Sequence, residues 1–447
     1  MIDLSKIEKY RENNRIEAKR ASGGFPGSVW ETYSAFANTL GGIILLGVEE
    51  LKDKSFHLVD LKNAEALAEE FRRKVSDTRY VSANILKPSD VSVEEIDGKR
   101  IVAITVPRAR RQDKPIYIDK DPYSGSYRRN GEGDYRCTRD EIDAMIRDAA
   151  IETDDMRRLD GYGASALKLE SLERFLGYDV SCDTEILKKL GVVDNDERLS
   201  LAGLMMFGCD SDIKKQLPNF SLTYKGAAVE YSAENICDLL FFVLNRFQKR
   251  LESLGIAEQA SAQVFAALKE ALVNCLVNAD YRIGGIVVED LKNEIRFLNP
   301  GGFRIDINGA KSGGVSDPRN RGLIKIITYV GSAKGSGSGI PGIYTVWRAN
   351  GWREPNFEEL FSPDRTVLTL SFEKRKGRAS ASKSADAIYR DMIISHLTRM
   401  ICASASEVAR ATGISRYRAS RLLNLLVEEG IAVIDGSEKA KKYKLKA

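Results

Sequence analysis

The 447-residue sequence is poor in the residues that organise metal clusters and disulfide-bonded folds. It has six cysteines and two histidines, and the cysteines are scattered singly without a CxxC pair. A structural zinc site or a disulfide framework is therefore not expected. The motif GxxxxGK followed by Ser or Thr is also missing, so hydrolysis of a nucleotide at a P-loop has no motif support.

Long apolar runs are missing as well. The most apolar stretches, "GGIILLGV" and "LAGLMMFG", are far too short to span a bilayer. No apolar segment follows the N-terminus, so a signal peptide is not expected. We therefore predict a cytoplasmic protein without a membrane anchor.

The composition indicates folded domains and a local excess of positive charge. Hydrophobic residues make up 43% of the sequence and charged residues 30%, which is typical of globular proteins. The length favours roughly two to four domains. The net charge is only +4, but cations gather at 374–384, 415–421 and 439–446. Such clusters predict contact with nucleic acid.

The pattern of apolar residues predicts an α/β (α+β) multidomain protein. Residues 1–150 mix strands and helices, residues 151–260 are mainly helical, and residues 261–375 alternate helix and strand. The small, polar and basic stretch 376–385 has the composition of a flexible linker. It would separate these parts from a C-terminal unit, residues 386–447.

The C-terminal unit has the pattern of a winged helix–turn–helix. Two helical segments are followed by two short strands joined at "DGS". Arginines fall in the first turns of the second helix, where a recognition helix meets the major groove, and lysines fall near the second strand, where a wing meets phosphates. The alternative is a protein–protein module with a solvated basic face. The cations concerned are Arg416, Arg418, Arg421, Lys439, Lys441 and Lys442.

Carboxylates and a lysine alternate near the N-terminus. Glu17 and Lys19 are two apart on a predicted strand and share one face. Glu12 precedes that strand, and Glu49 and Glu50 end a later buried strand. Converging carboxylates would repel unless a cation lay among them, and Mg²⁺ or Mn²⁺ prefers such oxygen ligands. A metal site and a solvated surface both stay open.

The segments "SAFANTLGGIILLGVEE" and "SYRRNGEGDYRCTRDEID" resemble the Schlafen AlbA-type domain over about residues 8–150. In nuclease members of that family three acidic residues cleave RNA, and the resemblance implies Glu12, Glu17 and Glu50 for that site. The chain departs from the family in having Glu, not Asp, at the third position. The resemblance implies nucleic-acid binding more firmly than cleavage. Phosphate contacts would come from Lys19, Arg128, Arg129 and the run "ARRQDK" at 109–114, unless that run is a solvated loop.

A second block of motifs begins with "ALKEALVNCLVNADY", which places Glu270 and Asn274 at i and i+4 on one helical face. Downstream, "FLNPGGF", "SDPRN" and "GSGSGIPGI" supply turns whose backbone N–H groups can approach an anion closely. This block resembles the C-terminal domain of RecG-related proteins. That domain is a divergent form of the GHKL ATPase fold of gyrase, histidine kinases and heat-shock chaperones.

The second resemblance implies a role for each matched residue. Glu270 would be the general base and Asn274 the ligand of Mg²⁺. The chain departs from the pattern at Asn278 and Ala279, where His and Arg are usual, and it lacks the DxGxG adenine loop. We therefore expect ATP binding more firmly than ATP hydrolysis. The alternative is a degenerate domain that has only a structural role. The nucleotide-binding positions would be Asn274, Asn299, Gly301, Gly302, Gly335, Gly337 and Gly339.

The order of these parts predicts a nucleic-acid-binding protein. Our first interpretation is a transcriptional regulator that binds DNA and responds to a nucleotide. The second is a metal-dependent, Schlafen-like endoribonuclease acting on tRNA or another structured RNA. The third is a scaffold whose winged helix joins protomers. A regulator that reads a palindrome would be a two-fold dimer.

Overall fold

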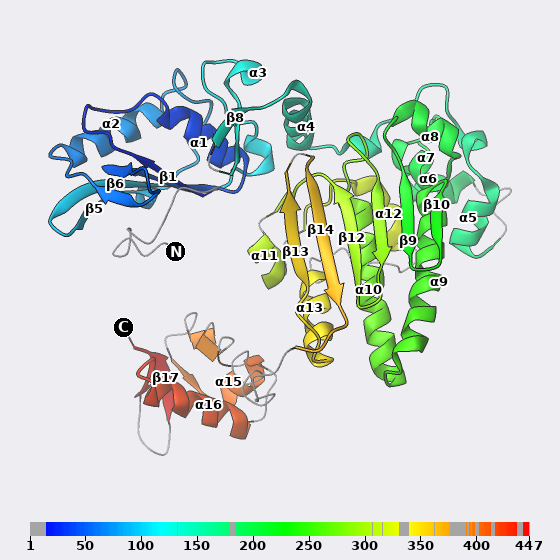
Figure 1. Cartoon of the computed structure of the whole chain (residues 1–447). Coiled ribbons are helices and arrows are strands. Elements are labelled where there is room, and N and C mark those ends of the chain that lie inside the picture. Colours follow the sequence, from blue (N-terminus) through cyan, green and yellow to red (C-terminus); the bar gives the residue numbers. More distant parts are fainter. Residues whose placement is uncertain are drawn as a thin grey trace. The chain divides into compact units, whose positions relative to one another are not determined.

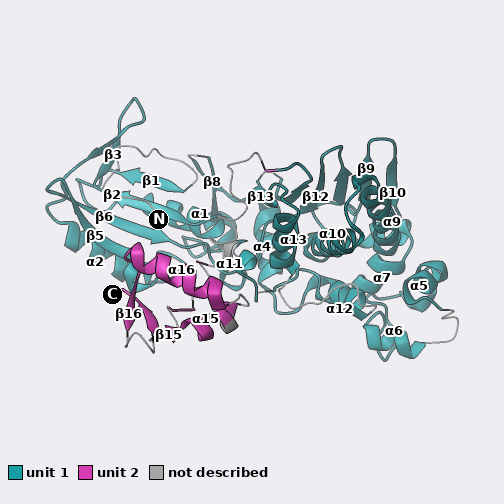
Figure 2. Cartoon of the chain, turned by 90° about the horizontal axis from the view of Figure 1, so that it is seen from below, with its two compact units in different colours: residues 1–374 teal, residues 375–447 magenta. Residues whose placement is uncertain are grey.

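The computed structural model has two compact units, residues 1–374 and residues 375–447 (Figure 2). The linker predicted at 376–385 lies outside the described residues. The described residues are 15–131, 133–178, 184–305, 307–314, 316–329, 339–361, 363–375, 390, 393–394, 396–397, 402–412, 416–435 and 441–446.

The N-terminal part of the larger unit is built on a four-stranded sheet with the order β1-β2-β6-β5. β1 runs parallel to β2, and the other neighbours are antiparallel. The strands are β1 (Ile16–Lys19), β2 (Gly42–Leu46), β5 (Val91–Ile96) and β6 (Lys99–Val106). The other elements are α1 (Val29–Asn38), β3 (Val48–Glu50), β4 (Phe56–Leu58), α2 (Ala64–Val75), η2 (Pro88–Asp90), η3 (Arg111–Asp113), α3 (Pro122–Gly125), β7 (Tyr127–Asn130), β8 (Gly133–Arg136) and α4 (Arg139–Ala149).

Both faces of this sheet are covered, which explains the uninterrupted apolar run in β2. Ile44 and Leu46 pack in the core that includes α1 and α2, whereas Leu45 packs in a second core with β3 and β4. A strand buried on both faces needs apolar residues at every position. Thr138 is the N-cap of α4, and its side chain forms a capping box with Glu141.

The second part of the larger unit contains a six-stranded mixed sheet with the order β10-β9-β11-β12-β14-β13. In Figure 1 its strands lie in front of α9, α10 and α13. The segment expected to be mainly helical also contributes β9 and β10 to this sheet. The strands are β9 (Leu222–Gly226), β10 (Glu230–Ala233), β11 (Ile286–Asp290), β12 (Glu294–Pro300), β13 (Asn356–Leu360) and β14 (Arg365–Ser371). The helices are η4 (Asp154–Met156), η5 (Ala164–Ala166), α5 (Leu169–Leu176), α6 (Thr184–Leu190), α7 (Leu201–Phe207), α8 (Asp210–Gln216), α9 (Ile236–Leu254), α10 (Glu258–Asn278), α11 (Ile307–Ser312), α12 (Arg321–Tyr329) and α13 (Gly339–Ala349).

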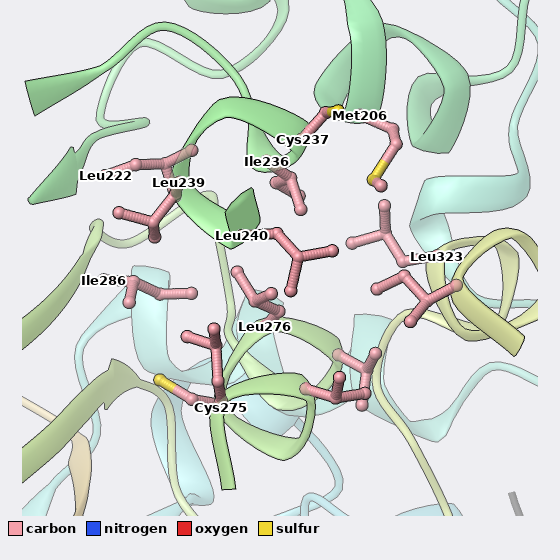
Figure 3. Packing of buried hydrophobic residues seen from close by; sticks show 14 of the residues in the cluster. Met206, Leu222, Ile236, Cys237, Leu239, Leu240, Cys275, Leu276, Ile286 and Leu323 are labelled. Atoms are coloured by element: carbon pink, nitrogen blue, oxygen red, sulfur yellow. The ribbon is translucent and has the colours of Figure 1, made fainter. Parts of the chain in front are cut away.

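One continuous core joins these helices to the sheet. Figure 3 shows Leu240 of α9 and Leu276 of α10 meeting Ile286 of β11 and Leu323 of α12. Among the described helices, α10 is long and apolar enough to cross a membrane by length and composition. Its buried side chains, such as Leu268, pack in this core, as in the central helix of a folded domain.

The smaller unit has the topology of a winged helix. Two helices precede a hairpin, and the three-stranded sheet has the order β15-β17-β16. Ser404 forms reciprocal hydrogen bonds with Glu407 and so caps α15. The predicted multidomain α/β class is therefore confirmed. The elements are β15 (Ala403–Ser404), α15 (Ala405–Thr412), α16 (Arg416–Glu428), β16 (Ala432–Asp435) and β17 (Lys442–Leu445).

Candidate functional site

A pocket lies beside α10 and the strands β12 and β14 of the six-stranded sheet. Its empty space is about 1120 Å³, including the part open to solvent. Most of the predicted nucleotide positions line it, whereas Gly335 and Gly337 lie outside the described residues and Gly301 does not line it. The predicted residues that the pocket brings together are Glu270, Asn274, Asn299, Gly302 and Gly339.

The helical wall carries the predicted acid and amide. Glu270 and Asn274 lie one turn apart on α10, and the Asn274 amide is 3.4 Å from Glu270 Oε1. The first residue of α13, Gly339, lies so close that an added Cβ would be 1.9 Å from the same oxygen. A side chain at this position would therefore displace the Glu270 carboxylate from its place in the pocket.

The strand wall carries a buried amide. Asn299 on β12 pairs in register with Thr366 on β14. The Thr366 hydroxyl donates to the carbonyl of Gly301 at 2.9 Å. The Asn299 amide forms no hydrogen bond with another described residue, although the residue is only 7% exposed. An amide offers two donors and an acceptor, so Asn299 can hydrogen-bond a polar ligand in the pocket.

Two arginines complete the rim. Arg304 has a side chain only 5% exposed, and its Nε is buried without a hydrogen-bond partner in the described structure. Burial, which Asp148 partly offsets, lowers the pKa of Arg304 to about 10. Arg319 donates from Nε and Nη2 to Asp148 at 3.0 and 2.7 Å, and from Nη1 to the Asn278 carbonyl at 2.6 Å. Burial opposes the charge of Arg319, but Asp148 outweighs it and raises the pKa.

These residues fit a nucleotide with its Mg²⁺. A carboxylate and an amide oxygen on one helical face suit a hydrated divalent cation. Arg304 suits a phosphate oxygen, since its buried Nε has no hydrogen-bond partner among the described residues, whereas the donors of Arg319 are taken by Asp148 and by backbone carbonyls. Apolar side chains suit a base, and in this pocket they include Phe297, Ile324 and Leu368.

Arginine–carboxylate pairs join the N-terminal part of the larger unit to the sheet that carries this pocket. We call these five pairs the seam. Asp148 of α4 pairs with Arg319, and the carbonyl of Asp148 also accepts from Arg111 and Arg304 at 2.6 and 3.1 Å. The pocket rim and α4 are therefore held by the same side chains. The seam consists of Arg108–Glu359, Arg111–Asp317, Arg128–Asp364, Arg147–Asp280 and Asp148–Arg319.

The N-terminal carboxylates are paired with cations. Glu17 contacts Lys19 at 2.7 Å and Arg129 at 2.8 Å. Glu50 contacts Lys54 at 3.3 Å, and its Oε1 is buried without a hydrogen-bond partner among the described residues. Glu12 lies outside those residues. Within the described residues no group of His, Cys, Asp or Glu is arranged to hold a metal, so the trio stays a prediction.

Lys19, Arg128 and Arg129, which were predicted to contact phosphates, lie in internal ion pairs. Arg129 is 2% exposed and pairs with Glu17 and with Asp134 at 2.9 Å. Arg128 pairs with Glu141 at 3.0 Å and belongs to the seam. As they stand, these guanidinium groups are occupied by carboxylates. Their predicted phosphate contacts, and that of Lys19, stay untested, and the nucleic-acid interface below does not depend on them.

The cations of the winged helix lie at the N-terminal end of α16 and on β17. Arg416 and Arg421 are exposed, Arg418 is half-buried, and the neighbouring Tyr417 is 82% exposed. Lys441 and Lys442 are exposed at the start of β17, and Lys439 lies outside the described residues. Leu422, Leu423 and Leu426 form the buried face of α16. The helix therefore keeps its basic first turns away from its core.

Three protein-family profiles match the chain. The profile described as "Schlafen, AlbA_2" matches residues 12–138, and "Putative ATP-dependent DNA helicase recG C-terminal" matches residues 284–370. The chain carries a Schlafen AlbA_2 domain and a recG C-terminal domain. A "Domain of unknown function (DUF8451)" matches residues 143–223, between the two. The two family resemblances predicted for the larger unit are thus confirmed.

Two solved structures are similar to this chain. The DIP2311 protein from Corynebacterium diphtheriae is 16% identical, over 97% of this chain and 94% of its own, with a TM-score of 0.41. The N-terminal domain of a RecG-related protein from Nitrosomonas europaea is 32% identical, over 30% of this chain and 90% of its own, with a TM-score of 0.24. No match was found among curated proteins. The domain assignment therefore rests on the family profiles.

Sequence reasoning missed the seam, whose pairs join the AlbA_2 domain and α4 to the part of the unit that carries the recG C-terminal domain. Arg319 and Asp317 lie within "SDPRN", for which the sequence predicts only a turn, and Asp148 lies at the end of α4. The available signal was the alternation of Arg and Asp at the end of α4, "IRDA", and in "SDPRN". Nothing in the sequence says that these two short stretches meet.

Proposed function

We propose that the protein is a DNA-binding regulator whose recG C-terminal domain, together with α10, binds a nucleotide. The winged helix supplies the contact with duplex DNA, through α16 in the major groove and β17 along the phosphates. The observation that carries this proposal is that Arg416 and Arg421 are exposed on the first turns of α16, while Leu422, Leu423 and Leu426 form its buried face.

The nucleotide part of the proposal rests on the pocket beside α10. Glu270 and Asn274 share one helical face, Asn299 offers an amide, and Arg304 offers a buried donor. The family description of this domain, which names ATP and DNA, supports the same assignment. ATP with Mg²⁺ is the expected ligand, and the seam would carry its effect to the AlbA_2 domain.

A test of the DNA contact replaces Arg416, Arg418 and Arg421 by alanine in the full chain. Binding to a mixed-sequence duplex in dilute buffer should weaken strongly, because these groups supply the electrostatic part of affinity. A matched control replaces Arg79, Arg198 and Arg353, whose side chains are 74%, 51% and 52% exposed in the larger unit. Equal binding by both variants would remove the winged helix as the reader and favour the scaffold.

A ribonuclease is the second candidate, and one observation favours it. Glu50 Oε1 is buried without a hydrogen-bond partner among the described residues, as expected where a cation would complete the site. Against this, Lys19 and Arg129 already pair with Glu17. The test is RNA cleavage with Mn²⁺ by the wild type and by Glu17→Gln. Loss of cleavage in the variant would establish the nuclease.

A cytoplasmic location and a two-fold dimer stay predictions.

A further inference from the structure

A second pocket lies along the seam, between the AlbA_2 domain and the recG C-terminal domain. Its empty space is about 700 Å³, including its open mouth. It shares Gly302, Phe303, Arg304 and Arg319 with the nucleotide pocket and has walls of its own, which include Met145. The cations that line it are Arg108, Arg111, Lys114, Arg128, Arg304 and Arg319, and the carboxylates are Glu141, Asp148, Asp280, Glu359 and Asp364.

Lys114 differs from the arginines around it. Five of the six cations have a carboxylate within ion-pair distance, as for Arg108 with Glu359 at 2.7 Å and Arg128 with Asp364 at 2.9 Å. Lys114 forms no ion pair with a described carboxylate. Its ammonium donates to the Asn38 carbonyl at 2.6 Å, which leaves two of its three donors without an acceptor among the described residues.

The surroundings of Lys114 disfavour a bare positive charge. Part of the side chain is open to the pocket, yet burial, and then the neighbouring Arg108 and Arg128, lower the pKa of Lys114 well below its usual range. Glu359 and Asp364 lie near enough to act in the opposite direction but form no ion pair with Lys114. A buried cation with no carboxylate in contact destabilises the fold. A negatively charged ligand would remove that penalty and satisfy the remaining donors.

We propose that the seam pocket binds a small oxyanion, with phosphate as its simplest member and the Lys114 ammonium as its principal contact. The apolar wall formed by Met145, Phe303 and Phe361 leaves room for an organic group attached to the oxyanion. The site is distinct from the nucleotide pocket because Asn274 and Glu270 do not line it. It also gives a role to the run 109–114 that includes Lys114.

The experiment is a calorimetric titration of the full chain with inorganic phosphate at near-neutral pH. Wild-type protein should bind, and Lys114→Gln should lose at least about tenfold in affinity, or about 1.4 kcal/mol. Glutamine can still donate to the Asn38 carbonyl, so a role of Lys114 limited to capping the end of α1 would be preserved. Lys52→Met, which changes an exposed lysine of the same domain, should bind as the wild type does.

Two further variants keep the outcome decisive. Asn274→Ala should retain phosphate binding if the anion occupies the seam pocket, and loss of binding there would place it in the nucleotide pocket and overturn the proposal. Lys114→Met carries the same test should the glutamine variant fail to fold. No binding of phosphate by the wild type, or equal binding by the wild type and both Lys114 variants, would also overturn it.

Discussion

Replacing Asp148 by asparagine should loosen the contact between α4 and the recG C-terminal domain. The change keeps the size of the side chain but removes the charge that holds Arg319. Both partners are largely buried, with side chains 22% and 11% exposed. Breaking such a pair costs about 3 kcal/mol, because the remaining guanidinium keeps its desolvation penalty. At about 1.4 kcal/mol per tenfold, amide exchange in α4 should accelerate roughly a hundredfold.

Hydrogen–deuterium exchange of the full chain measures this opening locally, without assuming two-state unfolding of a multidomain protein. The control is Asp196→Asn, because Asp196 is 77% exposed and pairs with Arg198 at 3.2 Å. An exposed pair contributes at most about 1 kcal/mol, so exchange near residue 196 should change little. The reasoning is refuted if α4 exchanges at the wild-type rate in Asp148→Asn, or if both variants behave alike.

Three further predictions concern ligands and pH. Mg²⁺–ATP should raise the melting temperature of the wild type, and Asn274→Ala should abolish the rise; an equal rise in both would place the nucleotide elsewhere. Burial raises the pKa of the Asp148 carboxyl, but Arg319 outweighs burial, so the pKa is lowered in the folded protein. The pair therefore stabilises the fold at pH values above the ordinary carboxyl pKa. This contribution is lost as the pH falls through the lower pKa of the folded protein. Wild-type melting curves should therefore fall more steeply with acid than those of Asp148→Asn, and parallel curves would contradict this. Because the pKa of Lys114 is lowered in the folded protein, the unfolded chain binds more protons than the folded one. The stability of the wild type should therefore rise with pH up to about 10, and it should rise less in Lys114→Gln. Identical slopes of stability against pH in the two proteins would be evidence against a desolvated ammonium.

The elements that were predicted well are those with strong local patterns. The helix α1 could be read from Trp30, Tyr33 and Phe36 on one face, and all three are buried. The polar residues Lys292 and Asn293 mark the turn between β11 and β12. The winged helix followed from two helices and a hairpin in order. Periodicity and capping act within a few residues, so the sequence is enough to reveal them.

The parts that could not be predicted depend on long-range pairing. β9 joins the six-stranded sheet through a parallel pairing with β11, which lies more than fifty residues away, and no local signal specifies such a partner. Arg129 read as a surface phosphate contact because it lies in a basic stretch, yet its partner Glu17 is brought to it by the fold. A charged residue therefore cannot be assigned to solvent or ligand from sequence until its possible partners are known.

The nucleotide pocket lies between these two cases. Glu270 and Asn274 were placed on one face from their spacing, and the structure brings Asn299 and Gly339 to the same pocket. Those two residues are found by the family resemblance and not by periodicity. Arg304 has a buried Nε at the pocket and carries no motif of its own.

The most direct test of the account is the salt dependence of DNA binding by the full chain. Fluorescence anisotropy with a labelled duplex, over a range of salt concentrations, gives the number of phosphates neutralised from the slope, about −0.9 for each. We predict binding that weakens linearly on a log–log plot, with a slope shallower by up to about three units when Arg416, Arg418 and Arg421 are all alanine. Binding with the same affinity and slope in the two proteins, or no binding in dilute buffer, would contradict it.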